Sequence, residues 1–156
     1  MTKIKVKKLK SMKIAYIEHT GPYDKVPYGD YYEKLYGWAK EVKAKPGFKP
    51  LSVYPSDPHT TPPEQAKTWV AIPIHGSPVE TEEIKIKELP AAEAAVCKYA
   101  GDSTVIEQTY KDLTAWMEEN GYEASAPPME VYTKMPKEKD GKTIVYATVQ
   151  MPVKKK

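Results

Sequence analysis

The chain has 156 residues, with 24 Lys plus Arg against 21 Asp plus Glu and a net charge of +3. This length fits one domain with a substantial core. Many lysines lie at the two ends, but no basic helix with interleaved aromatic rings accompanies them, so we expect solvated termini and no direct nucleic-acid binding. The single cysteine, Cys97, excludes an internal disulfide framework and a cysteine-rich metal site.

The N-terminal residues carry charges where a signal peptide needs an apolar core. No apolar run approaches the length of a membrane span, so no membrane partner is expected. We therefore predict a soluble protein of the reducing cytoplasm. The residues leave the oligomeric state open.

A duplication is the strongest pattern in the chain, because residues 4–58 recur at 84–136. The first strand-like segments match at an offset of 80 residues, and the same offset carries Gly21 onto Gly101. The helical segments then match at an offset of 78, after a deletion from the second copy. A short slip of this kind in a loop is typical of one supersecondary unit used twice.

The duplication predicts one domain over 1–156, made of two pseudo-twofold repeats at about 3–76 and 83–153. A seam between such repeats is a natural cleft for a ligand.

In chain order, the first copy predicts two strands, a helix and two further strands, at 3–9, 12–19, about 23–43, 51–54 and 68–74. The first two strands are expected to form a hairpin through Lys10 and Ser11. A proline-rich loop that starts at Asp57 separates the last two strands.

The second copy predicts the same order of elements, at 83–89, 93–99, about 105–120, 128–133 and 143–151. Gly121 is expected to stop the helix. Asp140 and Gly141 give the strongest turn signal in the chain, because an Asp-Gly pair supplies the positive φ that tight hairpins need. The fold class is therefore α+β, with two similar units.

Alternation along the strands predicts which side chains share a face. Met129 and Val131 are expected to pack under the helices, which leaves Glu130 and Tyr132 on the opposite face. The same pattern turns four apolar residues of the last strand toward the helices, namely Val145, Ala147, Val149 and Met151. It places Tyr146, Thr148 and Gln150 on the opposite face, together with Trp69 and Tyr54 of the first copy.

The face away from the helices is therefore expected to be aromatic, with several rings around the Glu130 carboxylate. A solvated sheet face would carry Lys, Glu and Thr instead. An apolar surface with a few convergent polar groups is the usual pattern of a ligand site. The alternative is a second aromatic core with no ligand.

Several segments resemble one known family in order along nearly the whole chain. Residues 15–23, Ala-Tyr-Ile-Glu-His-Thr-Gly-Pro-Tyr, resemble the opening of GyrI-like small-molecule-binding domains. The second half is similar as well, through Leu89-Pro90-Ala91, Tyr99-Ala100-Gly101, Tyr110, Leu113 and Trp116. Residues 128–132, Pro-Met-Glu-Val-Tyr, resemble the Pro-x-x-Glu-x-Tyr strand of that family.

The resemblance implies two strand-helix-strand-strand modules that form a curved antiparallel sheet, with two helices on one face and a groove on the other. It also implies three functional hypotheses. The groove binds hydrophobic, aromatic and also cationic compounds, as an effector site or to sequester toxic molecules. Alternatively the chain hydrolyses cyclopropane-bearing DNA-alkylating compounds, or it binds a protein as a modulator of the DNA gyrase type. Without a DNA-binding helix-turn-helix partner it is not expected to be a complete regulator.

Glu130 carries the main site prediction, as the charge that selects cations or as the general base of a hydrolase. A simpler alternative is an ion pair with a lysine at the rim of the sheet. The predicted ligand-binding residues are Glu130, Tyr132, Trp69, Tyr146, Tyr54, Tyr16, Thr148 and Gln150.

No cofactor and no metal are expected. His19, His59 and His75 are scattered without ligand-like spacing, which also leaves a haem without a marked axial ligand. Cys97 follows the apolar stretch 94–96 and is interpreted as a buried small residue without an adjacent base.

Overall fold

The computed structural model of the chain describes residues 3–47, 49–56, 60–76 and 78–156. His59 and the start of the expected loop at Asp57 lie outside these residues. The described residues form two α-helices and antiparallel β-sheet, so the predicted α+β class is confirmed. Neither helix is long and apolar enough to cross a membrane.

The chain divides into two compact units. Unit 1 consists of Met1–Leu9 together with Ala92–Lys156, and unit 2 is the uninterrupted segment Lys10–Ala91.

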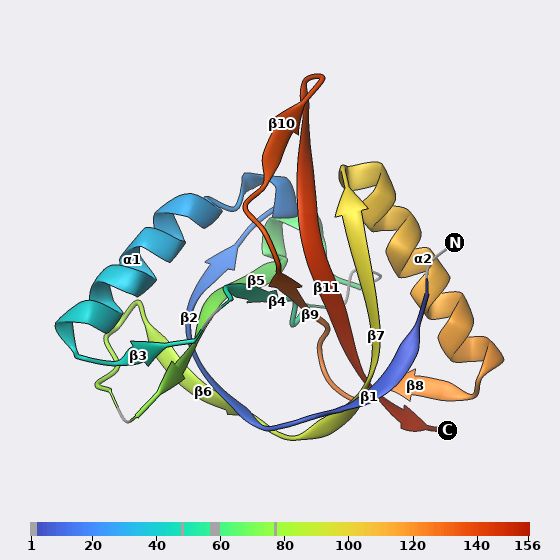
Figure 1. The fold of residues 1–156 in the computed structure, drawn as a ribbon, viewed down its shortest axis with the longest axis horizontal. Coiled ribbons are helices and arrows are strands. Elements are labelled where there is room, and N and C mark those ends of the chain that lie inside the picture. Colours follow the sequence, from blue (N-terminus) through green and yellow to red (C-terminus); the bar gives the residue numbers. More distant parts are fainter. Residues whose placement is uncertain (1–2, 48, 57–59, 77) are drawn as a thin grey trace. The chain divides into compact units, whose positions relative to one another are not determined.

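Unit 1 contains a sheet in the order β1-β7-β11-β9. Its strands are β1 (Lys5–Leu9), β7 (Ala92–Gly101), β9 (Met129–Tyr132) and β11 (Lys142–Lys155), and the short strands β8 (Tyr122–Ala124) and β10 (Lys137–Lys139) pair with β11. Helix α2 (Ser103–Glu119) lies along β7 (Figure 1).

Unit 2 contains a sheet in the order β4-β5-β2-β6. Its strands are β2 (Met12–Thr20), β4 (Leu51–Val53), β5 (Lys67–His75) and β6 (Lys85–Leu89), and β3 (Lys45–Pro46) pairs with β5. Helix α1 (Tyr28–Glu41) packs on β5 and β2, and the 3-10 turns Tyr23–Lys25 and Pro63–Gln65 complete the unit.

The first strand of each sequence copy pairs outside its own copy. β1 pairs with β7, with Lys5 opposite Val96, and β2 pairs with β6, with Met12 opposite Leu89. The expected hairpin of the first two strands is therefore wrong. A two-residue hairpin needs positive φ at its turn, whereas the only non-glycine residues with positive φ in the described chain are Lys43 and Asp140.

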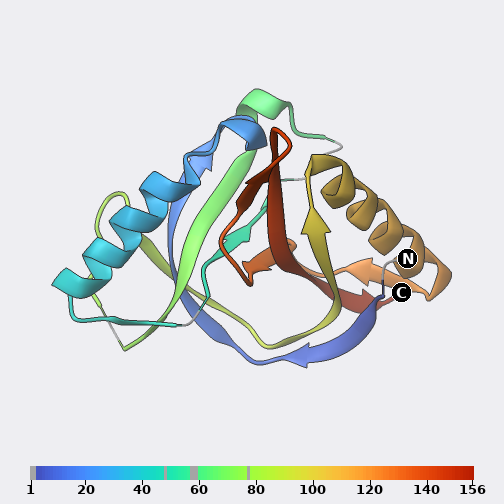
Figure 2. The same cartoon turned by 45° about the horizontal axis from the view of Figure 1, so that its top comes forward.

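The predicted turn at Asp140 is confirmed. Asp140 and Gly141 have φ values of 53° and 76°, and they join β10 to β11 with Lys139 opposite Lys142. The hairpin extends beyond the end of β7, since Gly101 pairs with Val145 further along β11 (Figure 2).

The helix boundaries follow local chemistry. α1 begins at Tyr28 and not near Tyr23, because the residue before a proline is driven to extended backbone and Val26 has ψ 120° ahead of Pro27. The Asp102 side chain caps α2 by accepting hydrogen bonds from the backbone N–H groups of Thr104 and Val105.

Two features fix the ends of α2. A Cβ atom at Gly101 would lie 2.5 Å from the Cβ of Val105, so only glycine allows the tight approach of β7 to the helix. Gly121, with φ 74°, follows the end of the helix, as the sequence predicts.

Each unit has its own apolar core between its helix and its sheet. In unit 2 the core includes Leu35 and Trp38 of α1, and in unit 1 it includes Leu113 and Met117 of α2. The inward side chains of β11 in unit 1 include Ala147 and Val149, as the strand alternation predicts.

Candidate functional site

Glu130 is a buried carboxylate in unit 1, with 4% of its surface exposed. It lies on β9 and accepts hydrogen bonds from two tyrosine hydroxyls. Tyr99 of β7 donates to Oε1, and Tyr110 of α2 donates to Oε2 at 2.7 Å. Both carboxylate oxygens are therefore held, one from the sheet and one from the helix.

The register of the sheet brings these groups together. Val149 of β11 lies opposite Glu130 on one side and opposite Cys97 on the other. The next inward residue of β11, Ala147, lies between Tyr99 and Tyr132 in the same way. Directly opposite residues project to the same face of a sheet, so the carboxylate and both rings face α2.

Burial raises the pKa of Glu130 above its ordinary value, although the hydrogen bonds from Tyr110 and Tyr99 act in the opposite direction. Burial, and then the charge of Glu130, raise the pKa of Tyr110, which keeps its hydroxyl protonated as a donor. None of the ion pairs among the described residues includes Glu130. The site therefore contains a carboxylate with hydrogen-bond donors and no cation, which is costly in a protein interior.

Cys97 adjoins this site, but its thiol is unreactive. Its side chain is buried, and burial together with the charges of Asp112 and Glu130 raises the pKa of the thiol to about 11. The thiol is thus protonated at neutral pH and a poor nucleophile.

The predicted face of Glu130 and Tyr132 is wrong. Both side chains lie on the helix side, where Glu130 meets Tyr110 and Tyr132 packs against the core of unit 1. The alternation separates two faces correctly, but the assignment assumed that Met129 and Val131 would be the buried pair. Two tyrosine hydroxyls instead allow the carboxylate to be buried.

Tyr54 is also on the helix side of its sheet, not on the outer face as expected. Its hydroxyl is 3.5 Å from the hydroxyl of Tyr28 on α1, and its ring meets Tyr23 edge-on at 5.5 Å between centroids. Ser52, two residues earlier and on the same face of the strand, lies opposite the core residue Val70, which shows that β4 turns this face toward α1.

Tyr16 and Trp69 form a second aromatic cluster, on the face of unit 2 away from α1. Their rings stack with centroids 4.5 Å apart. The Trp69 indole N–H donates to Glu18 at 3.0 Å, and Glu18 pairs with Lys67 at 3.1 Å. The Lys87 ammonium lies 5.5 Å from the Trp69 ring centroid.

The other predicted residues, Tyr146, Thr148 and Gln150, are half-buried on the face of β11 opposite to Val149. The Lys134 ammonium lies 5.3 Å from the centroid of the Tyr146 ring. The structure therefore separates the predicted set into smaller groups, and the ligand-binding roles stay predictions.

Sequence reasoning missed Tyr99 and Tyr110 as the partners of Glu130. The available signals were strand alternation, which places Tyr99 two residues beyond Cys97, and the helical spacing of Tyr110 with the core residue Leu113. Among the described residues, no three His, Cys, Asp or Glu side chains gather as metal ligands.

The sequence profile of the GyrI-like small molecule binding domain matches residues 2–154. The chain belongs to this family. No curated protein matches the sequence of this GyrI-like chain.

Three solved proteins have a similar fold. The EcmrR C-terminal domain has a TM-score of 0.74 at 19% identity, covering 100% of this chain and 99% of that one. In the EcmrR–DNA complex the TM-score is 0.76 at 16% identity, and the match covers 99% of this chain but 58% of that one, so our chain spans little more than half of its length.

SAV2435 bound to tetraphenylphosphonium has a TM-score of 0.60 at 12% identity, covering 97% of this chain and 94% of that one. A hydrolase encoded by lin2189 from Listeria innocua has a TM-score of 0.68 at 15% identity, covering 97% and 92%. At these identities the likeness shows a shared fold.

Proposed function

We propose that this GyrI-like chain binds hydrophobic aromatic cations, as an effector or to sequester them, and that Glu130 supplies the charge that selects them. The observation that supports this is the buried carboxylate of Glu130, held by Tyr99 and Tyr110 with no cation beside it among the described residues. Small-molecule binding is the property of the family, and the solved structure of SAV2435 contains an organic cation.

The energetics favour a positively charged ligand. A carboxylate buried without a cation destabilises the fold, and a ligand cation recovers part of that free energy on binding. Each aromatic ring that faces the cation adds about 0.5–2 kcal/mol. Tyr110 donates to the carboxylate, and Tyr132 packs on the core of unit 1 two residues further along β9, so both rings can supply such faces.

A ligand reaches Glu130 only when one of the surrounding rings moves, because the carboxylate is almost fully buried. Tyr110 and Tyr132 are each only half-buried. Displacement of either ring would exchange a tyrosine contact for a ligand contact. The half-exposed Tyr16 and Trp69 stack offers a further aromatic surface within unit 2.

We infer a cytoplasmic location, in keeping with the buried, unpaired Cys97.

The test is a titration of the purified protein with tetraphenylphosphonium, in which isothermal titration calorimetry measures the affinity. Glu130→Gln keeps the shape of the side chain and removes its charge, so we expect affinity to fall about tenfold or more. Glu119→Gln is the matched control, since it removes an exposed carboxylate at the end of α2 in the same unit, and it should change affinity less than about twofold. Equal affinity for Glu130→Gln and wild type would exclude Glu130 as the selecting charge.

The same carboxylate supports hydrolysis as a second function. A raised pKa and two neighbouring hydroxyls suit a general base that takes a proton from water. The resulting hydroxide would attack a cyclopropane carbon, and the breaking C–C bond would leave its electron pair on a conjugated carbonyl as an enolate, which then takes up a proton. General-base action of this kind contributes about a hundredfold to ten-thousandfold in rate.

Mass spectrometry of a cyclopropane-bearing alkylator incubated with the protein separates the two functions. A ring-opened product that gains one water over many turnovers indicates an enzyme, and Glu130→Gln should then abolish turnover while affinity for the compound is kept. Binding without product supports the binding function alone.

A further inference from the structure

We propose that unit 2 contains a second small-molecule site, formed around Thr68, His19 and Tyr31 under the first turns of α1, and that it takes uncharged aromatic compounds bearing a carbonyl or hydroxyl oxygen. This site lies within unit 2 alone. It does not depend on the function proposed for Glu130.

The sheet of unit 2 repeats the frame of the Glu130 site with different side chains. Ser52 lies opposite Val70, and Val70 lies opposite Ile17, just as Glu130, Val149 and Cys97 lie in one row in unit 1. The next row contains His19 opposite Thr68, where unit 1 has Tyr99 opposite Ala147. Unit 2 therefore has a hydroxyl and an imidazole where unit 1 has a methyl group and a phenol.

The Thr68 hydroxyl is the observation that points to a ligand. Thr68 is fully buried, with 0% of its surface exposed, and its Oγ1 is the one buried side-chain oxygen or nitrogen of the described residues without a hydrogen-bond partner. A buried hydroxyl left unpaired costs about 1–3 kcal/mol, so proteins seldom keep one without a reason. A ligand oxygen that hydrogen-bonds to Thr68 would recover this free energy.

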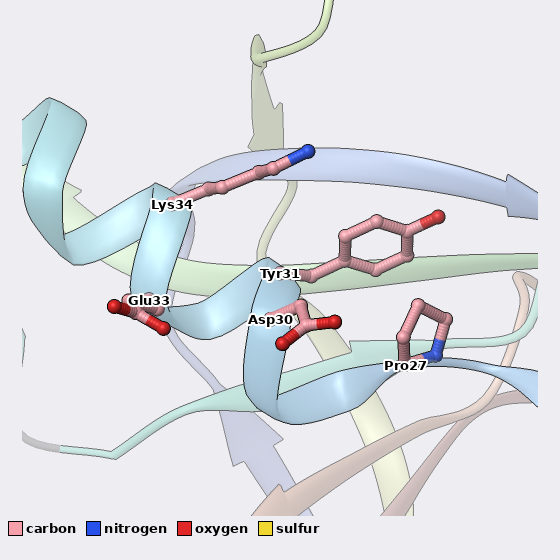
Figure 3. Close-up of a pocket in the computed structure, with 5 residues that line it drawn as sticks. All are labelled: Pro27, Asp30, Tyr31, Glu33 and Lys34. Atoms are coloured by element: carbon pink, nitrogen blue, oxygen red, sulfur yellow. The ribbon is translucent and has the colours of Figure 1, made fainter.

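Tyr31 connects this buried region with an open pocket on the surface of unit 2. The pocket has a volume of about 510 Å³ and is lined by Pro27, Asp30, Tyr31, Glu33 and Lys34 (Figure 3). On its inner side the Tyr31 hydroxyl lies 3.0 Å from Nδ1 of His19. Tyr31 therefore contacts both the pocket and His19, which lies opposite Thr68 in the sheet, and we expect rotation of this one side chain to open a path inward.

The charges around this path define the ligand class. Asp30 and Glu33 at the pocket repel anions, and Lys34 is already paired with Glu83 at 2.9 Å. The interior offers no carboxylate to compensate a cation, since Ser52 stands at the position of Glu130. Once Tyr31 has moved, an uncharged ring would contact the apolar side chains of this core, such as Leu35 and Val70, and one oxygen on that ring would hydrogen-bond to Thr68.

Coumarin is a suitable probe, because it is planar, uncharged and carries a carbonyl oxygen. We expect calorimetry to show coumarin binding to the wild-type protein, and Thr68→Val to weaken it about tenfold, the loss of one buried hydrogen bond. Thr109→Val is the matched control, since Thr109 is a buried threonine of unit 1 whose hydroxyl already donates to the Val105 carbonyl at 2.8 Å. It should leave coumarin affinity unchanged.

Stability provides a second readout that needs no ligand. Thr68→Val removes an unpaired hydroxyl and should raise Tm, whereas Thr109→Val removes a hydrogen bond and should lower it. No coumarin binding, equal affinity in Thr68→Val, or a lower Tm for that variant would overturn the proposal.

A competition experiment distinguishes the two sites. Tetraphenylphosphonium should not displace coumarin, and Glu130→Gln should leave coumarin affinity unchanged. Competition between the two probes would show that coumarin binds at Glu130 and would overturn the second site, whereas failure of the phosphonium to bind would count against the function proposed for Glu130 only.

Discussion

The two units build equivalent sheet positions but use them for different polar groups. Unit 1 buries the Glu130 carboxylate between two tyrosine hydroxyls, whereas unit 2 buries the uncharged Ser52 at the matching place. One backbone frame therefore accepts either a charge or a neutral hydroxyl. The difference lies in the side chains that surround the position.

The tyrosines of unit 2 are engaged elsewhere. Tyr32, which the repeat aligns with Tyr110, donates to the Leu51 carbonyl at 2.7 Å. His19, which stands in the place of Tyr99, contacts Tyr31. A carboxylate at Ser52 would thus compete with the Leu51 carbonyl for the Tyr32 hydroxyl and would meet His19 in place of Tyr99. The charge in unit 1 therefore depends on its hydroxyl partners.

Ser52→Glu tests this dependence most severely. It introduces a carboxylate at a fully buried position of unit 2, and we expect the free energy of unfolding to fall by about 3 kcal/mol or more. Urea denaturation measures the loss. Ser125→Glu, at an exposed serine of unit 1, is the control and should change stability by less than about 0.5 kcal/mol. A loss below about 1 kcal/mol for Ser52→Glu would show that unit 2 accommodates the charge as well as unit 1 does.

Removal of a single hydroxyl from either unit should have a smaller effect. Tyr110→Phe takes one donor from a buried carboxylate, so we expect a loss of about 1.5–3 kcal/mol. Tyr32→Phe takes a donor from a neutral carbonyl, for which about 0.5–1.5 kcal/mol is expected. Denaturation of both variants at neutral pH compares them directly. Equal losses would mean that the charge of Glu130 does not strengthen its hydrogen bond.

The pH dependence of stability gives the smallest expected effect. The pKa of Glu130 is higher in the folded protein than in the unfolded chain. The folded state therefore holds the proton more tightly, which stabilises the fold at low pH. This stabilisation is lost as pH rises through the pKa of the folded state. We expect Glu130→Gln to raise Tm at neutral pH. The gain should shrink as pH falls toward the ordinary carboxyl pKa of 4.5. A Tm difference that is constant with pH would show that Glu130 does not titrate differently in the fold.

Much of the architecture can be predicted from the sequence because it is local or repeated. The two helices, the turn at Asp140 and the inward side chains of β11 all follow from spacing and turn chemistry. Strand partners are a different matter, since no local signal at Lys10 and Ser11 specifies that β1 pairs with a strand of the other copy.

The candidate site was predictable only in part. Strand alternation separates the faces of β9 but does not tell which face turns toward α2, since Met129 and Glu130 on opposite faces are both buried. The decisive contacts come from Tyr99 and Tyr110, which lie on two other elements. A buried carboxylate can be recognised only when its donors are placed with it.

The pairing of β1 with β7 also determines the order in which the two units can fold during synthesis. Unit 2 is one continuous segment, so all of its strands exist once residue 91 has left the ribosome. β1 is made before unit 2, yet its partner β7 begins at Ala92, so Lys5 cannot pair until Val96 has been made. Pairings between residues this far apart form slowly, because a long loop must close first. A nascent chain would therefore carry a finished unit 2 while the lysine-rich first strand still has no partner.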